Sequence, residues 1–173
     1  MSPFVLSQVL AGLAFGLGLM SVQFRSRRRV LLCLALSTAA NASHFVLLGR
    51  HAAAALLVLI GVRYLVAIAW LDRRLMYLFL LATAAGFAAT WDGPLGLLAL
   101  LAALVGTYGS FQAADRTLRR CLIAGNSAWL LHNALAMTPV AALMEAFNLT
   151  SNVLAYWRFH ARRRTSSQAA SVT

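Results

Sequence analysis

Among the polar side chains that interrupt the apolar runs of this sequence, eight carry most of its capacity for chemistry. Polar groups at bilayer depth cost free energy unless they are paired or line a wet cavity. We therefore predict that these side chains form a substrate-binding or gating site. They are two histidines, one arginine, one glutamate and four asparagines: His44, His132, Arg63, Glu145, Asn41, Asn126, Asn148 and Asn152.

Arg63 and Glu145 allow more than one interpretation. An arginine at the centre of a membrane helix costs about 2.5–3.5 kcal/mol, and it stays charged, so it needs an acceptor. Glu145 is the one acid inside an apolar run. Arg63 could bind an anionic or carbonyl-bearing solute, or the two residues could open and close as a gate. Alternatively, they form a structural ion pair. Glu145 could also carry a proton.

The histidines and asparagines leave similar alternatives open. His44 and His132 could serve the site or make hydrogen bonds between helices. Asn148 and Asn152 are four residues apart, so both lie on one face of a helix. Their amides could bind a hydroxylated or amide-bearing ligand, or bond a neighbouring helix.

Catalysis is not expected from these residues. Glu145 has no second acid within the apolar runs, and no serine lies in a recognised nucleophile motif. No metal or other cofactor is expected, because Cys33 and Cys121 lack a ligand spacing and are interpreted as reduced thiols. Five glycines are expected to mark close helix packing: Gly12, Gly16, Gly61, Gly106 and Gly109.

The elements that position these side chains follow from composition. The chain has 173 residues, of which 61% are hydrophobic and 11% charged, with a mean hydropathy of +0.77. A soluble domain is about 45–50% apolar and about 25% charged. These values exclude a soluble globular domain and predict a multi-pass helical membrane protein. Seven apolar runs are predicted to span: 5–22, 30–48, 52–71, 75–90, 95–112, 121–137 and 140–158.

Arginine supplies all of the strong positive charge. The net charge is +11, and the sequence has no lysine. Counted by connector, 13 arginines are predicted on one side of the membrane, and only Arg50 is predicted on the other. The positive-inside rule then places the N-terminus outside and the C-terminus in the cytoplasm of a bacterial inner membrane. Because the arginines stand between apolar runs, we expect anionic lipid at the cytoplasmic face, and no nucleic acid.

Several of the rarer residue types recur 88 positions apart along the sequence. We therefore predict two parallel three-helix repeats, 1–74 and 95–160, joined by an inversion linker helix, 75–94, and followed by a disordered cytoplasmic tail, 161–173. Transporters of this 3+1+3 kind place the substrate near the midplane between the repeats. The matching pairs are Cys33 and Cys121, His44 and His132, Gly18 and Gly106, and Arg74 and Arg162.

The chain resembles the YgjV-type family of bacterial inner-membrane proteins over nearly its whole length. The matching stretches are 44–49 (HFVLLG), 61–63 (GVR), 105–107 (VGT), 129–133 (WLLHN), 144–145 (ME), Asn152 and Arg158. That family is distantly similar to the SWEET, PQ-loop and PnuC transporters, which are built from three-helix repeats. The resemblance implies a 3+1+3 bundle and, by analogy of fold, transport. The sequence has neither a Pro-Gln pair nor a WxxW motif, so neither sugar nor nicotinamide riboside is implied.

Two functions from different classes stay open. One is a transporter or facilitator for a small polar metabolite, with its site at the midplane between the repeats. The other is a non-transporting membrane module for assembly, lipid binding or sensing, in which Arg63 and Glu145 form a structural pair. The expected partners are the lipid bilayer and a small polar solute, and the analogy also allows a homo-oligomer.

Overall fold

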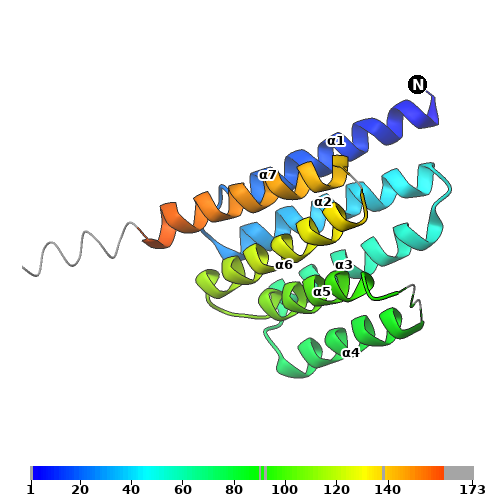
Figure 1. Ribbon diagram of the computed structural model, residues 1–173. Helices are drawn as coiled ribbons and strands as arrows, with labels where there is room; N and C mark the ends of the chain where they lie inside the picture. Colours follow the sequence, from blue (N-terminus) through cyan, green and yellow to red (C-terminus); the bar gives the residue numbers. More distant parts are fainter. Residues whose placement is uncertain (1, 90, 92, 138, 162–173) are drawn as a thin grey trace, which may run out of the picture. The chain divides into compact units, whose positions relative to one another are not determined.

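The computed structural model describes residues 2–89, 91, 93–137 and 139–161, with side chains placed for all except 52, 53, 140 and 161. These residues form seven α-helices and one short π-helix and contain no β-strand, so the predicted all-α class is confirmed. The predicted tail, 161–173, lies outside the described residues apart from Ala161. The helices are α1 (Pro3–Ser21), α2 (Arg27–Leu47), α3 (His51–Ala69), α4 (Arg73–Ala89), α5 (Gly96–Ser110), α6 (Asp115–Leu135), α7 (Pro139–Tyr156) and η1 (Trp157–Ala161) (Figure 1).

The chain divides into two compact units, with the boundary after Leu71. In the first unit, α2 packs along both α1 and α3, so three helices lie side by side (Figure 1). In the second unit, α6 packs in the same way along α5 and α7, and α4 packs against α5. Each unit therefore has a central helix that holds two flanking ones.

The central helices begin earlier than the apolar runs indicate. The second and sixth runs are predicted to start at residues 30 and 121, whereas α2 starts at Arg27 and α6 at Asp115. Arginine is a good helix former, so the helix continues through residues that interrupt the hydropathy. As a result, Arg116, Arg119 and Arg120 belong to the first two turns of α6 and not to a connector.

The offset of 88 extends from residue types to the ends of the helices. The starts of α2 and α6 differ by 115 − 27 = 88, and their ends by 135 − 47 = 88. The starts of α3 and α7 differ by 139 − 51 = 88. In the turns before α3 and α7, Gly49 (φ 70°) and Met137 (φ 55°) both adopt the left-handed backbone conformation, and 137 − 49 = 88. Corresponding turns of the two units thus share a backbone shape.

Packing within each unit follows the same offset. In the first unit, Ser37 Oγ donates a 2.7 Å hydrogen bond to the carbonyl oxygen of Ala14. The positions 88 residues later are Gly125 and Ala102, and a Cβ added to Gly125 would lie 3.5 Å from the Ala102 carbonyl oxygen. The central helix therefore approaches the first flanking helix at the same place in both units.

Only two of the five glycines expected at close contacts have a near neighbour. A Cβ on Gly61 would lie 2.9 Å from Thr38 Oγ1, and one on Gly109 would overlap the Cβ of Cys121. Among the described residues, no atom lies within 4 Å of a Cβ added to Gly12, Gly16 or Gly106. For those three the prediction is wrong, because a glycine permits close helix packing without requiring it.

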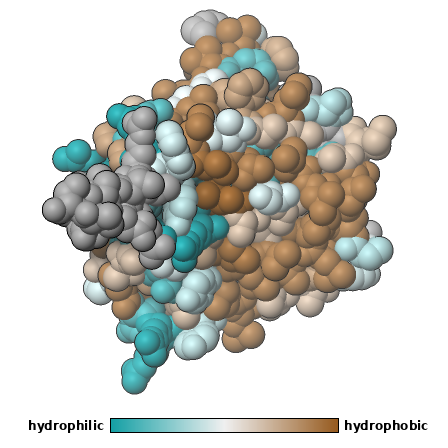
Figure 2. Space-filling model, turned by 60° about the vertical axis from the view of Figure 1, so that its left-hand side comes forward, coloured by the Kyte–Doolittle hydropathy of each residue, from teal (hydrophilic) through white to brown (hydrophobic). Residues whose placement is uncertain are grey.

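Large apolar side chains gather on the surface of the molecule. Leu81, Phe147 and Tyr77 are each more than 60% exposed, whereas small residues such as Ala67 and Ala102 are buried. Most of the surface in Figure 2 is hydrophobic. Small residues inside and large apolar residues outside are typical of helices that pack within lipid. By length and composition, α1 and α2 could each cross a membrane, and the apolar segments Ala54–Ala69 and Gly96–Ser110 are shorter.

Candidate functional site

Three of the predicted site residues share one face of α7. Glu145, Asn148 and Asn152 are three and four residues apart, which is the spacing of neighbours on a helix surface. Glu145 and Asn152 are separated by seven residues, or about 10 Å along the axis. The helix therefore presents a carboxylate and two amides in a row.

Asn152 is the most enclosed member of this row, with an exposed fraction of 5%. Its Nδ2 donates a 3.0 Å hydrogen bond to the backbone carbonyl of Asn148, one turn earlier. That bond engages the donor end of the amide. Within the described part of the chain, Asn152 Oδ1 is buried and accepts no hydrogen bond.

Glu145 carries a second buried acceptor. The residue is half-buried, and its Oε2 is shielded and has no hydrogen-bond donor among the described residues. A buried acceptor without a donor costs about 1–3 kcal/mol. The α7 face therefore holds two oxygens, Glu145 Oε2 and Asn152 Oδ1, that a ligand bearing N–H or O–H groups would satisfy.

In the first unit, Arg63 is buried, with an exposed fraction of 6%. Its guanidinium carbon lies 4.9 Å from the centre of the Tyr64 ring, within the range of a cation–π interaction. Because Arg63 and Glu145 belong to different units, their pairing stays a prediction.

His44 holds two helices of the first unit together. Its Nδ1 lies 2.8 Å from the carbonyl oxygen of Ser7 on α1 and forms a hydrogen bond when it carries the proton. Its ring also meets Phe45 edge to face at 4.9 Å. Asn41 is half-buried one turn earlier on α2.

His132 lies at the corresponding position of the second unit with different contacts. Its Nδ1 is 3.4 Å from Asn133 Oδ1, and its ring meets Trp129 edge to face at 5.4 Å. Asn126 is half-buried earlier on α6. The two histidines thus share a position in the repeat while their described contacts differ.

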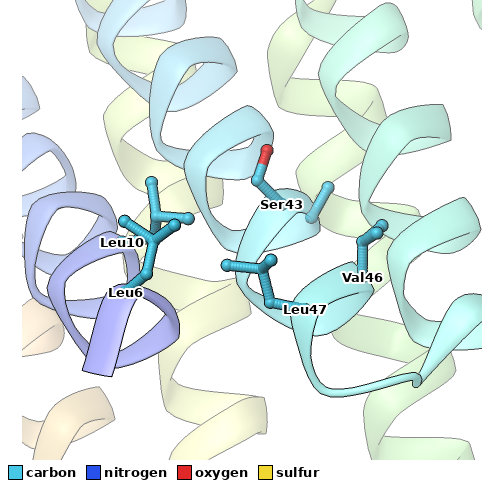
Figure 3. A pocket seen from close by; sticks show the side chains of 6 residues that line it. Leu6, Leu10, Ser43, Val46 and Leu47 are labelled. Carbon is cyan, nitrogen blue, oxygen red and sulfur yellow. The ribbon is translucent and has the colours of Figure 1, made fainter. Parts of the chain in front are cut away.

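A groove of about 370 Å³ opens between α1 and α2 (Figure 3). The labelled side chains come from the start of α1 and the end of α2 and are mostly aliphatic. None of the eight predicted site residues lines it. An apolar groove of this kind does not recognise a polar solute. Its lining residues are Leu6, Leu10, Ala42, Ser43, Val46 and Leu47.

A buried ionic cluster at the start of α6 was not predicted from the sequence. The side chain of Arg119 is fully buried, and its Nε donates a 2.9 Å hydrogen bond to Asp115 Oδ2. His160 Nε2 lies 2.9 Å from the same oxygen, and the Arg119 guanidinium carbon is 5.1 Å from the Phe159 ring. The signal in the sequence was the spacing of four residues between an acid and an arginine.

Two further arginines meet a tyrosine next to that cluster. The Nε atoms of Arg116 and Arg120 donate hydrogen bonds of 3.0 Å and 3.1 Å to the hydroxyl of Tyr156, the last residue of α7. In the sequence, these arginines stand out only as charge that sets the topology. Only the packing of α6 on α7 reveals that they converge on one oxygen.

Comparison with known proteins places the chain in a family. The family described as bacterial inner membrane protein, YgjV, matches residues 5–163, so the chain belongs to that family. The inner membrane protein YgjV of Escherichia coli (strain K12) is 26% identical over 165 residues, which cover 94% of this chain and 90% of that protein. No solved structure matches the chain.

Proposed function

We propose that this member of the YgjV family of bacterial inner membrane proteins is a multi-pass transporter or facilitator for a small polar solute. The observation that carries the proposal is the pair of buried acceptors on α7, Glu145 Oε2 and Asn152 Oδ1. In a membrane, an unsatisfied polar group is costly and marks a pathway for a substrate or ion. A solute with hydroxyl or amine groups would supply the missing donors.

Each of the two units has polar groups that could bind a solute. The first supplies the buried cation of Arg63, which suits a carbonyl or an anionic group on the solute. The second supplies the acceptors of α7. Acceptors on α7 favour a solute with N–H or O–H donors, and Arg63 favours one with a carbonyl or anionic group.

The repeat supports this assignment. We infer two parallel three-helix units, α1–α3 and α5–α7, from the common offset of helix ends, turns and close contacts. Transporters are built from parallel repeats in several families. The distribution of arginines supports an orientation with the N-terminus outside and the C-terminus in the cytoplasm.

A ligand screen by thermal shift tests the proposal. Full-length protein purified in detergent is heated with pooled polar metabolites, and the unfolding temperature is recorded. A ligand at a hundredfold excess over its dissociation constant stabilises the folded state by about 2.7 kcal/mol. Any ligand found is then tested for uptake into proteoliposomes.

Three variants make the screen specific. Asn152→Leu and Glu145→Gln alter the two acceptors, and we expect both to abolish ligand stabilisation. Thr150→Val is the matched control, because Thr150 is exposed on another face of α7. Stabilisation that survives in Asn152→Leu, or a screen with no ligand and no uptake, would contradict the proposal and favour the non-transporting module.

A further inference from the structure

Arg116, Arg120 and Tyr156 form a cluster that presents hydrogen-bond donors and positive charge. Both arginines lie on α6, one turn apart, and their Nε atoms approach Tyr156 Oη at 3.0 Å and 3.1 Å. Their guanidinium carbons lie 6.0 Å and 5.8 Å from the centre of the tyrosine ring. The phenol therefore holds the two guanidinium groups close together.

Counting hydrogen bonds shows what this cluster lacks. The phenol oxygen accepts both Nε–H groups, so its lone pairs are used and its own hydrogen is available to donate. Within the described residues, the terminal nitrogens of the two arginines make no hydrogen bond or ion pair. The cluster has several donors and no acceptor for them.

Asp115, the acid in the first turn of α6, forms no ion pair with either arginine within the part of the chain that the structure describes. Asp115 directs Oδ2 to Arg119 and to His160, at 2.9 Å each. Like charges one turn apart on a helix repel each other. The first turn of α6 adds the positive end of the helix dipole, and its N-cap residue, Ala114, supplies no side-chain acceptor. An anion with several oxygens would relieve both conditions.

We propose that Arg116, Arg120 and Tyr156 bind the phosphate group of an anionic membrane phospholipid. Guanidinium groups match phosphate with parallel hydrogen bonds, and the phenol O–H adds a third donor. Trp157, the next residue, is 53% exposed, and tryptophan is typical of the level of lipid head groups. This site is independent of the proposed solute pathway.

The first unit offers a natural control for the proposal. The positions 88 residues before Arg116, Arg120 and Tyr156 are Arg28, Leu32 and Ile68 (116 − 88, 120 − 88 and 156 − 88). Arg28 is exposed at the corresponding position of α2, and the residues that correspond to Arg120 and Tyr156 are apolar. Arg28→Gln removes the same charge without touching the cluster.

Native mass spectrometry and thermal shift of the full-length protein test the site. The probes are phosphatidylglycerol, phosphatidylcholine and inorganic phosphate, each added to detergent micelles. We expect wild type and Arg28→Gln to retain phosphatidylglycerol, and Arg116→Gln and Arg120→Gln each to bind it about tenfold more weakly. Competition by inorganic phosphate at high concentration would support the shared phosphate chemistry.

Two conservative variants keep the test decisive if a glutamine variant fails to fold. Arg120→Lys keeps the charge but loses the planar fork, and Tyr156→Phe loses only the hydroxyl. We expect both to weaken phosphatidylglycerol binding. Equal retention of phosphatidylcholine, equal loss in Arg28→Gln, or binding of inorganic phosphate without binding of lipid would overturn the assignment to a phospholipid.

Discussion

The starts of the two central helices show how one backbone frame can carry two different chemistries. Leu31 in α2 and Arg119 in α6 occupy corresponding positions (119 − 88 = 31), and both are fully buried, with exposed fractions of 0%. Leu31 packs as an apolar residue. Arg119 instead needs Asp115 and contacts the Phe159 ring. Two buried positions 88 residues apart therefore hold a hydrocarbon side chain in one unit and a charged side chain with an ionic partner in the other.

The groups that compensate charge also differ between the start of α2 and the start of α6. In the first unit, Arg27 Nη2 donates a 2.8 Å hydrogen bond to the carbonyl of Ala67, in the last turn of α3. A cation is favoured there because the helix dipole is negative at its C-terminal end. In the second unit, the residue corresponding to Arg27 is Asp115, and its charge is balanced by side chains. At the start of α2, the arginine is therefore satisfied by a backbone carbonyl. At the start of α6, the charges are satisfied by other side chains.

The largest loss of stability is expected from disrupting the ionic cluster at the start of α6. Asp115→Ala removes the carboxylate that Arg119 and His160 share and leaves the Arg119 charge buried without it. We expect the free energy of unfolding to fall by about 3 kcal/mol. Denaturant unfolding in detergent measures it. The comparison is Asp72→Ala, which removes an exposed carboxylate that accepts a 2.7 Å hydrogen bond from the backbone N–H of Arg74, with an expected loss of about 1 kcal/mol. Equal small losses in both variants would show that the ionic cluster contributes no more to stability than an exposed acid does.

The close contact between Gly109 of α5 and Cys121 of α6 should be nearly as sensitive to substitution. Gly109→Ala places a Cβ against Cys121, and we expect a loss of about 2 kcal/mol from overpacking. The corresponding residue in the first unit is Ser21 (109 − 88 = 21), which is buried without such a clash. Gly106→Ala, in open space on the same helix, is the control. A stable Gly109→Ala variant would mean that α5 and α6 adjust their separation freely.

The backbone contact of the first unit should matter less. Arg27→Met keeps most of the aliphatic stem but removes the hydrogen bond to Ala67, and we expect a loss of about 1.5 kcal/mol. Arg28→Met, at the exposed neighbouring position, should change little. Unfolding of the two variants side by side measures the difference. Matching losses would assign the effect to net charge and not to the helix end.

The smallest effect is expected at the turns. Met137 adopts a positive φ that glycine adopts freely, as Gly49 does in the first unit. We expect Met137→Gly to raise the free energy of unfolding by about 1 kcal/mol, and Gly49→Ala to lower it by a similar amount. Thermal unfolding of each variant measures the change. Stabilisation by Gly49→Ala would refute the idea that backbone strain distinguishes these turns.

Some features followed from local pattern alone. The helices could be predicted because continuous apolar runs of this length form helices. The offset of 88 between Cys33 and Cys121 also anticipated the common ends of α2 and α6. The row of Glu145, Asn148 and Asn152 needed only the spacing of residues along a helix.

Two clusters depend on tertiary structure: the ionic cluster around Asp115, and the cluster of Arg116, Arg120 and Tyr156. Tyr156 lies 36 residues from Arg120, and His160 lies 45 residues from Asp115. No local pattern indicates which residues of α7 and η1 will face the start of α6, because that depends on how two distant helices pack. The sequence by itself therefore determined where the helices lie and the offset of 88 that α2 and α6 share. Packing decided that Arg119 is buried and that Arg116 and Arg120 converge on one oxygen.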